Sequence, residues 1–170
     1  MNKKYDFDEN LFNMIYKKYH VRMRLISLQY MGEPDDAQDV CQDAWLKVMN
    51  NLSEYVGSGS FEGWVRTIFV TTSLNALRKR DRQILSPSKY YDLSTAARKE
   101  QKSEQFEFPY INDIVSKMPA GYKTIFNLYA IEGYKHHEIA EMLGISANTS
   151  KSQYSRAKER IQRELKKIAA

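Results

Sequence analysis

The chain of 170 residues contains a single cysteine, Cys41. One thiol excludes an intramolecular disulfide and any metal site built from several cysteines, and it suits a reducing compartment. No apolar run approaches the roughly 20 residues that a bilayer-spanning helix needs. The start of the chain, MNKKYDFDEN, also lacks the apolar segment of a secretory signal. These absences predict a soluble, cytoplasmic protein that does not insert into a membrane.

Glycine and proline are also scarce, at seven and four residues. Apolar residues recur at helical spacing and almost never alternate in the manner of strands, so the sequence predicts an all-α fold. Lysine and arginine outnumber the acidic residues by 26 to 21, which gives a net charge of +5 and a pI of about 9.1. Moderate basicity is only weak support for a polyanionic partner such as nucleic acid.

The most informative stretch runs from residue 134 to residue 167. Ile139 and Leu143 recur at helical spacing, Gly144 ends that helix, and Ser146 can cap a second one. The apolar face of the second helix is expected to hold Tyr154, Ala157, Ile161 and Leu165. A short helix, a glycine turn and a polar, basic second helix are typical of a helix-turn-helix that enters the major groove. An amphipathic hairpin with a solvated charged face is the plainer alternative.

The amino-terminal half predicts two helices of different character. The first should begin near Asp8 and carry one apolar stripe formed by Leu11, Ile15, Tyr19, Met23, Ile26 and Tyr30. The second should run from Asp35 or Asp36 to about Asn51. Between Glu33 and Asp43 there are five acidic residues and no basic one. DNA would repel such a face, which favours a different partner. The alternative is that the acids are solvated or stabilise the helix amino terminus.

A small polar loop, residues 56–60, precedes a third helix that Ser60 can cap. Its polar face, which ends in the basic run of residues 78–82, is expected to hold Thr67, Thr71, Asn75, Arg78 and Arg82. Aromatic residues, a polar loop and cations are also ingredients of a single-strand-binding surface. From about residue 83 to 108 the apolar periodicity fades and predicts a linker. Further helices around residues 111–118 and 122–129 should pack with the helix-turn-helix.

No credible catalytic constellation is present, so we predict neither an enzyme nor a bound cofactor or metal. Asp35, Asp36 and Asp39 match the DDxxD pattern of diphosphate-binding enzymes, but this short pattern arises often by chance and no second acidic motif follows. His136 and His137 are adjacent and therefore point to different sides of a helix, which favours solvation or phosphate contact over metal ligation. A small magnesium-dependent enzyme built on the aspartates stays as a minor alternative.

Three segments together resemble a bacterial sigma factor of the extracytoplasmic-function group. They are DDAQDVCQDAWLKVMNNL, FEGWVRTIFVTTSLNALRKR and the segment containing EIAEMLGIS. The resemblance covers nearly the whole chain and implies two small helical domains joined by a flexible linker. The implied boundaries are 1–83 for a domain like sigma region 2, 84–108 for the linker, and 109–170 for a domain like sigma region 4 that contains the helix-turn-helix.

The resemblance also implies roles for particular residues. The acidic helix would bind a coiled coil of bacterial core RNA polymerase through Asp36, Asp39, Gln42 and Asp43. The loop and third helix would recognise the minus-ten promoter element and hold its melted single strand through Ser58, Ser60, Phe61, Asn75, Arg78 and Lys79. The second helix of the helix-turn-helix would read the duplex minus-thirty-five element through Thr149, Lys151, Ser152, Gln153 and Arg156. An anti-sigma factor is a further candidate partner.

Some positions depart from the family pattern. Members often have asparagine at the position of Thr71, aspartate at Asn75, a branched aliphatic residue at Ser150 and arginine at Gln153. These departures concern the promoter sequence more than the class of protein, because glutamine can pair with adenine as arginine does with guanine. A stand-alone helix-turn-helix regulator is the main alternative function. It would bind duplex DNA without polymerase.

Overall fold

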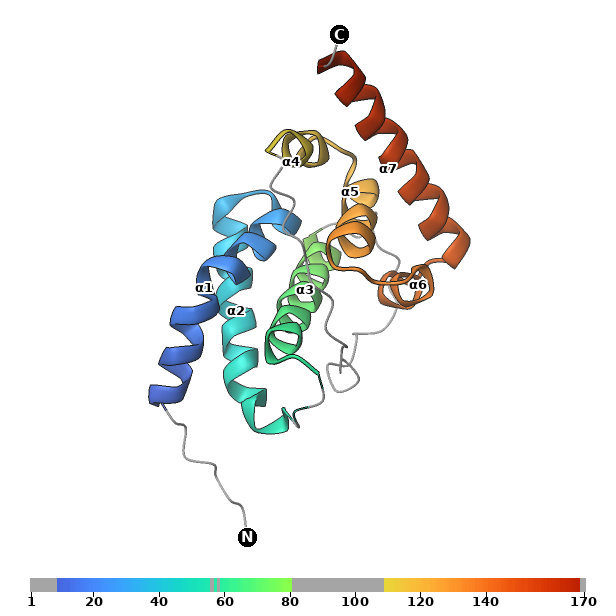
Figure 1. Ribbon diagram of the computed structural model, residues 1–170. Helices are drawn as coiled ribbons and strands as arrows, with labels where there is room; N and C mark the ends of the chain where they lie inside the picture. The colour runs from blue at the N-terminus through green and yellow to red at the C-terminus, as the bar shows by residue number, and fades with distance from the viewer. Residues whose placement is uncertain (1–8, 56, 58, 81–108, 169–170) are drawn as a thin grey trace. The chain divides into compact units, whose positions relative to one another are not determined.

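The computed structural model describes residues 9–55, 57, 59–80 and 109–168 (Figure 1). Every regular element within these ranges is a helix, which confirms the predicted all-α fold. The chain divides into two compact units, one holding the first helices up to Leu77 and the other holding the carboxy-terminal helices. The predicted linker, residues 84–108, lies outside the described residues.

The first unit contains three long helices. α1 spans Glu9–Met31, and α2 spans Pro34–Asn51 and continues into the short 3-10 helix η1 (Leu52–Glu54). α3 spans Phe61–Arg80, of which the part up to Leu77 belongs to this unit. Gly32, with φ of 82°, and Pro34 separate α1 from α2, because the glycine adopts the left-handed conformation and the proline favours the first turn of a helix. The first two helix boundaries therefore agree with the sequence.

Apolar side chains from all three helices are buried within this unit. They include Met23, Ile26, Val40, Trp45, Val48, Val65, Ile68 and Phe69. Trp45 on α2 packs edge-on against Phe69 on α3, with ring centroids 5.2 Å apart. Arg22 on α1 forms an ion pair with Glu62 on α3. The predicted α1 stripe is wrong at Leu11, whose side chain is 44% exposed on the first turn of the helix.

The polar face predicted for α3 is also partly wrong. Thr67 and Thr71 are buried, with only 4% and 2% of their surface exposed. Their hydroxyls donate to carbonyl oxygens one turn earlier, from Thr67 to Gly63 at 2.9 Å and from Thr71 to Thr67 at 2.8 Å. A threonine that satisfies its hydroxyl in this way can be buried without an unpaired polar group. A prediction from residue type therefore places these two threonines on the wrong face of α3.

The second unit is a compact group of four α-helices. α4 spans Pro109–Ser116, α5 spans Ala120–Phe126 and runs on into a π-helical turn, η3 (Asn127–Ile131), α6 spans His136–Leu143, and α7 spans Ala147–Ile168. One core is formed by Ile114, Val115, Met118, Phe126, Ala157 and Ile161. The apolar face predicted for α7 extends too far, because Leu165 is 37% exposed. No helix among the described residues is long and apolar enough to cross a membrane.

Candidate polymerase and promoter interfaces

The acidic residues of α2 form an outward face. Asp39, Gln42 and Asp43 are exposed and Asp36 is half-buried, while Ala37, Val40 and Ala44 on the other side of the helix are buried. The first-turn acids Asp35 and Asp36 also interact favourably with the helix dipole. Leu46 belongs to the same outward face and is 53% exposed. Leu46 was not among the predicted site residues, although its helical spacing from Asp39 and Asp43 places it on their face.

The start of α3 is fixed by its loop. The backbone N–H of Gly63 donates to Ser60 Oγ at 3.1 Å, so Ser60 caps the helix as predicted. The Tyr55 hydroxyl donates to the carbonyl oxygen of Gly59 at 2.8 Å, which ties the two ends of the loop together. Ser58 lies outside the described residues.

Half-buried aromatic side chains surround this capped end. Phe61 lies edge-on to Tyr55 at a centroid distance of 5.1 Å, and Trp64 lies 5.6 Å from Phe61 and 5.5 Å from Tyr55. Tyr19 of α1 approaches Phe61 at 6.1 Å. Aromatic faces of this kind can stack on unpaired bases. Tyr55 was not among the predicted site residues, although its place directly before the loop was a usable signal.

The remaining minus-ten candidates lie at the other end of α3. Asn75 and Arg78 are half-buried and Lys79 is exposed. Phe61 and Asn75 are separated by 14 residues of continuous helix, which corresponds to about 21 Å along the axis. The structure therefore brings Ser60 and Phe61 together and places Asn75, Arg78 and Lys79 in a second, separate group. A strand contacting both groups would have to run along the helix.

The helix-turn-helix is built by two local motifs. Gly144 ends α6 in the left-handed conformation, with φ of 67° and ψ of 35°. Ser146 then caps α7, because its Oγ accepts the Thr149 backbone N–H at 3.0 Å and lies 2.8 Å from the Thr149 hydroxyl. Both features agree with the sequence. Together they set the direction in which α7 leaves the turn.

Four of the five minus-thirty-five candidates share one face of α7. Thr149, Ser152, Gln153 and Arg156 follow the i, i+3, i+4, i+7 pattern, and Ser152 and Arg156 are exposed while Thr149 and Gln153 are half-buried. Lys151 is exposed on the opposite flank. Its charge acts on His136 of α6, and together with burial, the larger cause, it lowers the pKa of that imidazole. Lys151 is thus separated from the other four.

Two residues of α5 contact this shared face. Arg156 Nη1 donates to the Tyr122 hydroxyl at 3.3 Å, and this hydrogen bond is the main reason why the pKa of Arg156 is raised. Gly121 lies against the carboxamide of Gln153. Neither α5 residue was singled out from the sequence, because nothing in the local pattern of α5 indicates which side chains of α7 it meets.

His136 corrects a further expectation. Its ring stacks on Tyr129, with centroids 4.2 Å apart and planes 14° from parallel, and its Nδ1 lies 2.9 Å from the hydroxyl of Ser150. The side chain is therefore held between neighbouring helices instead of being fully solvated. Among the described residues no group of three or more histidine, cysteine, aspartate or glutamate side chains could hold a metal ion.

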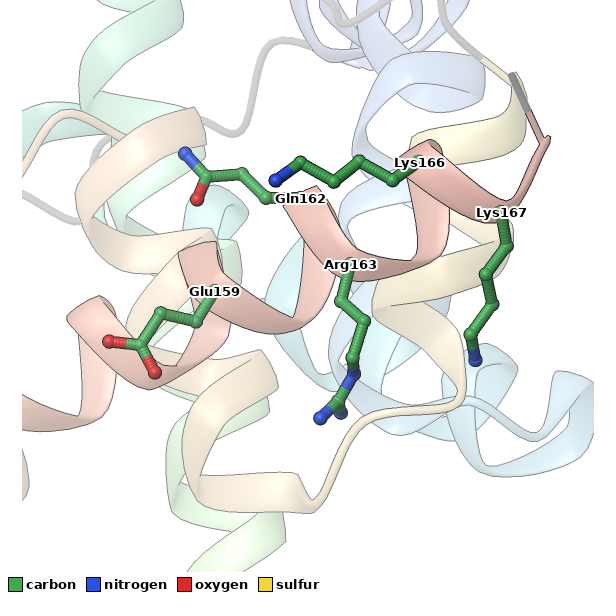
Figure 2. A pocket seen from close by; sticks show the side chains of 5 residues that line it. All are labelled: Glu159, Gln162, Arg163, Lys166 and Lys167. Atoms are coloured by element: carbon green, nitrogen blue, oxygen red, sulfur yellow. The ribbon is translucent and has the colours of Figure 1, made fainter. Parts of the chain in front are cut away.

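The carboxy-terminal half of α7 carries a shallow, mostly cationic pocket (Figure 2). Its lining residues are Glu159, Gln162, Arg163, Lys166 and Lys167. Lys167 also pairs with Glu164, with Nζ 3.0 Å from one carboxylate oxygen. The basic character predicted for this helix thus continues to its last turns.

Each of the two units matches a known protein family. Residues 15–83 match the family described as "Sigma-70 region 2", and residues 110–161 match "Sigma-70, region 4". The two matches cover the helices that carry the acidic face and the helix-turn-helix. A regulator built on the helix-turn-helix alone is not favoured, because it would leave the region 2 match unexplained.

Curated relatives span nearly the whole chain. The ECF RNA polymerase sigma-E factor of Haemophilus influenzae is 24% identical, covering 95% of this chain and 90% of the relative. The RNA polymerase sigma-H factor of Pseudomonas aeruginosa is 22% identical, over 95% and 89%. This chain belongs to the sigma-70 family and, within it, to the extracytoplasmic-function (ECF) group of promoter-specific transcription initiation factors.

Solved structures show the same fold. The sigma factor RpoE of Bartonella quintana, in complex with the anti-sigma factor NepR, superposes with a TM-score of 0.56 at 21% identity, covering 91% of this chain and 96% of that one. CnrH in complex with the cytosolic domain of CnrY gives a TM-score of 0.51 at 18% identity, over 94% and 90%.

Proposed function

We propose that the two units bind different parts of the transcription machinery. The acidic face of α2, formed by Asp36, Asp39, Gln42 and Asp43, binds core RNA polymerase. The loop and α3 engage the minus-ten element, with Ser58, Ser60 and Phe61 at one end of the helix and Asn75, Arg78 and Lys79 at the other. α7 reads the minus-thirty-five element with Thr149, Lys151, Ser152, Gln153 and Arg156. The functional boundaries are residues 1–83, 84–108 and 109–170.

One observation carries this assignment, namely the opposite charge of two outward helix faces. The exposed face of α2 presents Asp39 and Asp43, whereas the exposed face of α7 presents arginine and lysine side chains such as Arg156 and Arg163. A phosphate backbone attracts the second face and repels the first. A protein partner with a complementary basic surface therefore fits α2, and duplex DNA fits α7.

The test is run-off transcription with purified bacterial core RNA polymerase and a pool of randomised promoters. We expect initiation at a shared two-part motif, and we expect the double reversal Asp39→Lys/Asp43→Lys to abolish it together with binding to the core enzyme. Glu9→Lys/Asp113→Lys, which reverses two exposed acids on other helices, is the matched control and should retain activity. Initiation that survives the α2 reversal would contradict the assignment.

The same proposal covers partners and place of action. Two similar structures are complexes with an anti-sigma factor or with the cytosolic domain of a partner, which supports an anti-sigma factor as a candidate partner here. Action on core polymerase places the protein in the cytoplasm. No enzymatic activity of its own is proposed, since the polymerase performs the chemistry.

A further inference from the structure

The first turn of α5 meets the face of α7 at the two side chains best suited to reading bases. Gln153 and Arg156 lie about one turn apart on α7, and Gly121 and Tyr122 are adjacent on α5. Glutamine can pair with adenine and arginine with guanine, each through two hydrogen bonds in one plane. Such pairing demands a defined orientation of the planar end group. Whatever holds these end groups before DNA arrives therefore influences which bases they accept.

Tyr122 holds the arginine. Its half-buried side chain accepts a hydrogen bond from Arg156 Nη1 at 3.3 Å, while Arg156 itself is exposed. A free arginine side chain loses considerable rotamer entropy when it is fixed in a complex. A guanidinium that is already hydrogen-bonded to Tyr122 loses less rotamer entropy on binding. The hydrogen bond therefore favours DNA contacts made in that orientation.

Gly121 accommodates the glutamine. A Cβ at this position would lie 3.0 Å from Gln153 Oε1 and 3.8 Å from its Cδ. The backbone of Gly121 does not have a positive φ, so its own conformation does not require glycine. Glycine is also a poor helix former. A methyl group at this position would crowd the carboxamide and require Gln153 to shift slightly.

We propose that Gly121 and Tyr122 are positioning residues for promoter recognition, which set the orientations of Gln153 and Arg156 and so determine the preferred bases of the minus-thirty-five element. This inference rests on the proposed role of α7. It assigns to α5 a part in specificity that does not depend on α5 contacting DNA.

The experiment compares sequence preference by transcribing a library with a randomised minus-thirty-five element, using core polymerase and the full-length chain. Gln153→Ala and Arg156→Ala identify the base pairs that each side chain reads. Tyr122→Phe removes only the hydroxyl, and Gly121→Ala adds only a methyl group that would crowd the carboxamide of Gln153. Tyr129→Phe removes a tyrosine hydroxyl elsewhere in the unit and is the matched control.

We expect Tyr122→Phe to weaken base discrimination by about two- to tenfold, the size of one modest hydrogen bond, and only at the base pair assigned to Arg156. Gly121→Ala should change the preference at the base pair assigned to Gln153. Competition for core polymerase should be unchanged in both variants. A change confined to one base pair distinguishes a positioning role from a general loss of folding. Loss of folding would weaken recognition of all base pairs equally.

Three results would overturn the inference in different ways. If Gln153→Ala and Arg156→Ala alter the motif but Tyr122→Phe and Gly121→Ala leave it unchanged, α5 does not position the readers and the role of α7 stands. If neither alanine variant of α7 alters the motif, the role of α7 fails and the inference fails with it. Tighter minus-thirty-five recognition in Tyr122→Phe would also overturn it, since the tyrosine would then hold Arg156 away from DNA.

Discussion

The Ser150 hydroxyl lies 2.9 Å from Nδ1 of His136 and joins α7 to the first turn of α6. Ser150 is fully buried. A buried hydroxyl without a partner would destabilise the unit. The histidine supplies that partner, so the helix-turn-helix carries a polar link between its two helices in place of an apolar contact.

The first prediction concerns this link. Ser150→Ala and His136→Ala should each destabilise the second unit, and the double variant should lose less than the sum, with a coupling of about 0.5–1.5 kcal/mol. Urea unfolding of the full-length chain followed by far-ultraviolet circular dichroism measures the three variants. A coupling near zero would mean that the two side chains do not stabilise each other.

The second prediction is a pH dependence. Burial and, secondarily, the charge of Lys151 lower the pKa of His136, so the folded chain disfavours its protonated form. The unfolded chain binds that proton more readily, and the stability of the second unit should therefore decline as the pH falls below about 6.5, the ordinary value for histidine. His136→Asn keeps a hydrogen-bonding group but cannot titrate. It should show a smaller loss between pH 7 and pH 5, whereas equal losses would contradict the assignment.

The third prediction separates two roles of Ser60. Ser60→Ala removes the cap of α3 and should cost about 0.5–2 kcal/mol of stability. Ser60→Asp restores a capping oxygen but adds a negative charge, so it should regain the stability while weakening binding of a single-stranded minus-ten oligonucleotide by the polymerase complex. Ser60→Asn, a neutral capping residue, is the control and should be stable and retain more strand binding than Ser60→Asp. If the aspartate variant binds the strand normally, Ser60 does not lie beside it.

The fourth prediction addresses the turn between α6 and α7. Gly144→Ala places a Cβ in the left-handed conformation and should destabilise the second unit by about 1–2 kcal/mol. Asparagine tolerates this conformation better, so Gly144→Asn should be affected less. Thermal unfolding of both variants gives the comparison. Equal effects would show that the turn relaxes to another conformation.

The sequence predicted the helices well because each is encoded locally. The apolar spacing in α6, the left-handed turn at Gly144 and the serine caps at Ser60 and Ser146 involve residues that are near neighbours in the chain. Pairs such as Tyr122 with Arg156 and His136 with Ser150 could not be predicted, since they depend on how separate helices pack. The burial of Thr67 and Thr71 could not be predicted from their polarity, because each hydroxyl is satisfied by a carbonyl oxygen of the preceding turn.

Both tryptophans of the chain, Trp45 and Trp64, belong to the first unit, one buried in its core and the other half-buried beside the capped end of α3. All tryptophan emission of the isolated protein therefore originates in that unit. In a Trp45→Phe variant, Trp64 becomes the only indole. Its fluorescence would then be an intrinsic optical probe at the surface proposed to receive the melted strand, sensitive to a base stacking nearby and requiring no attached dye.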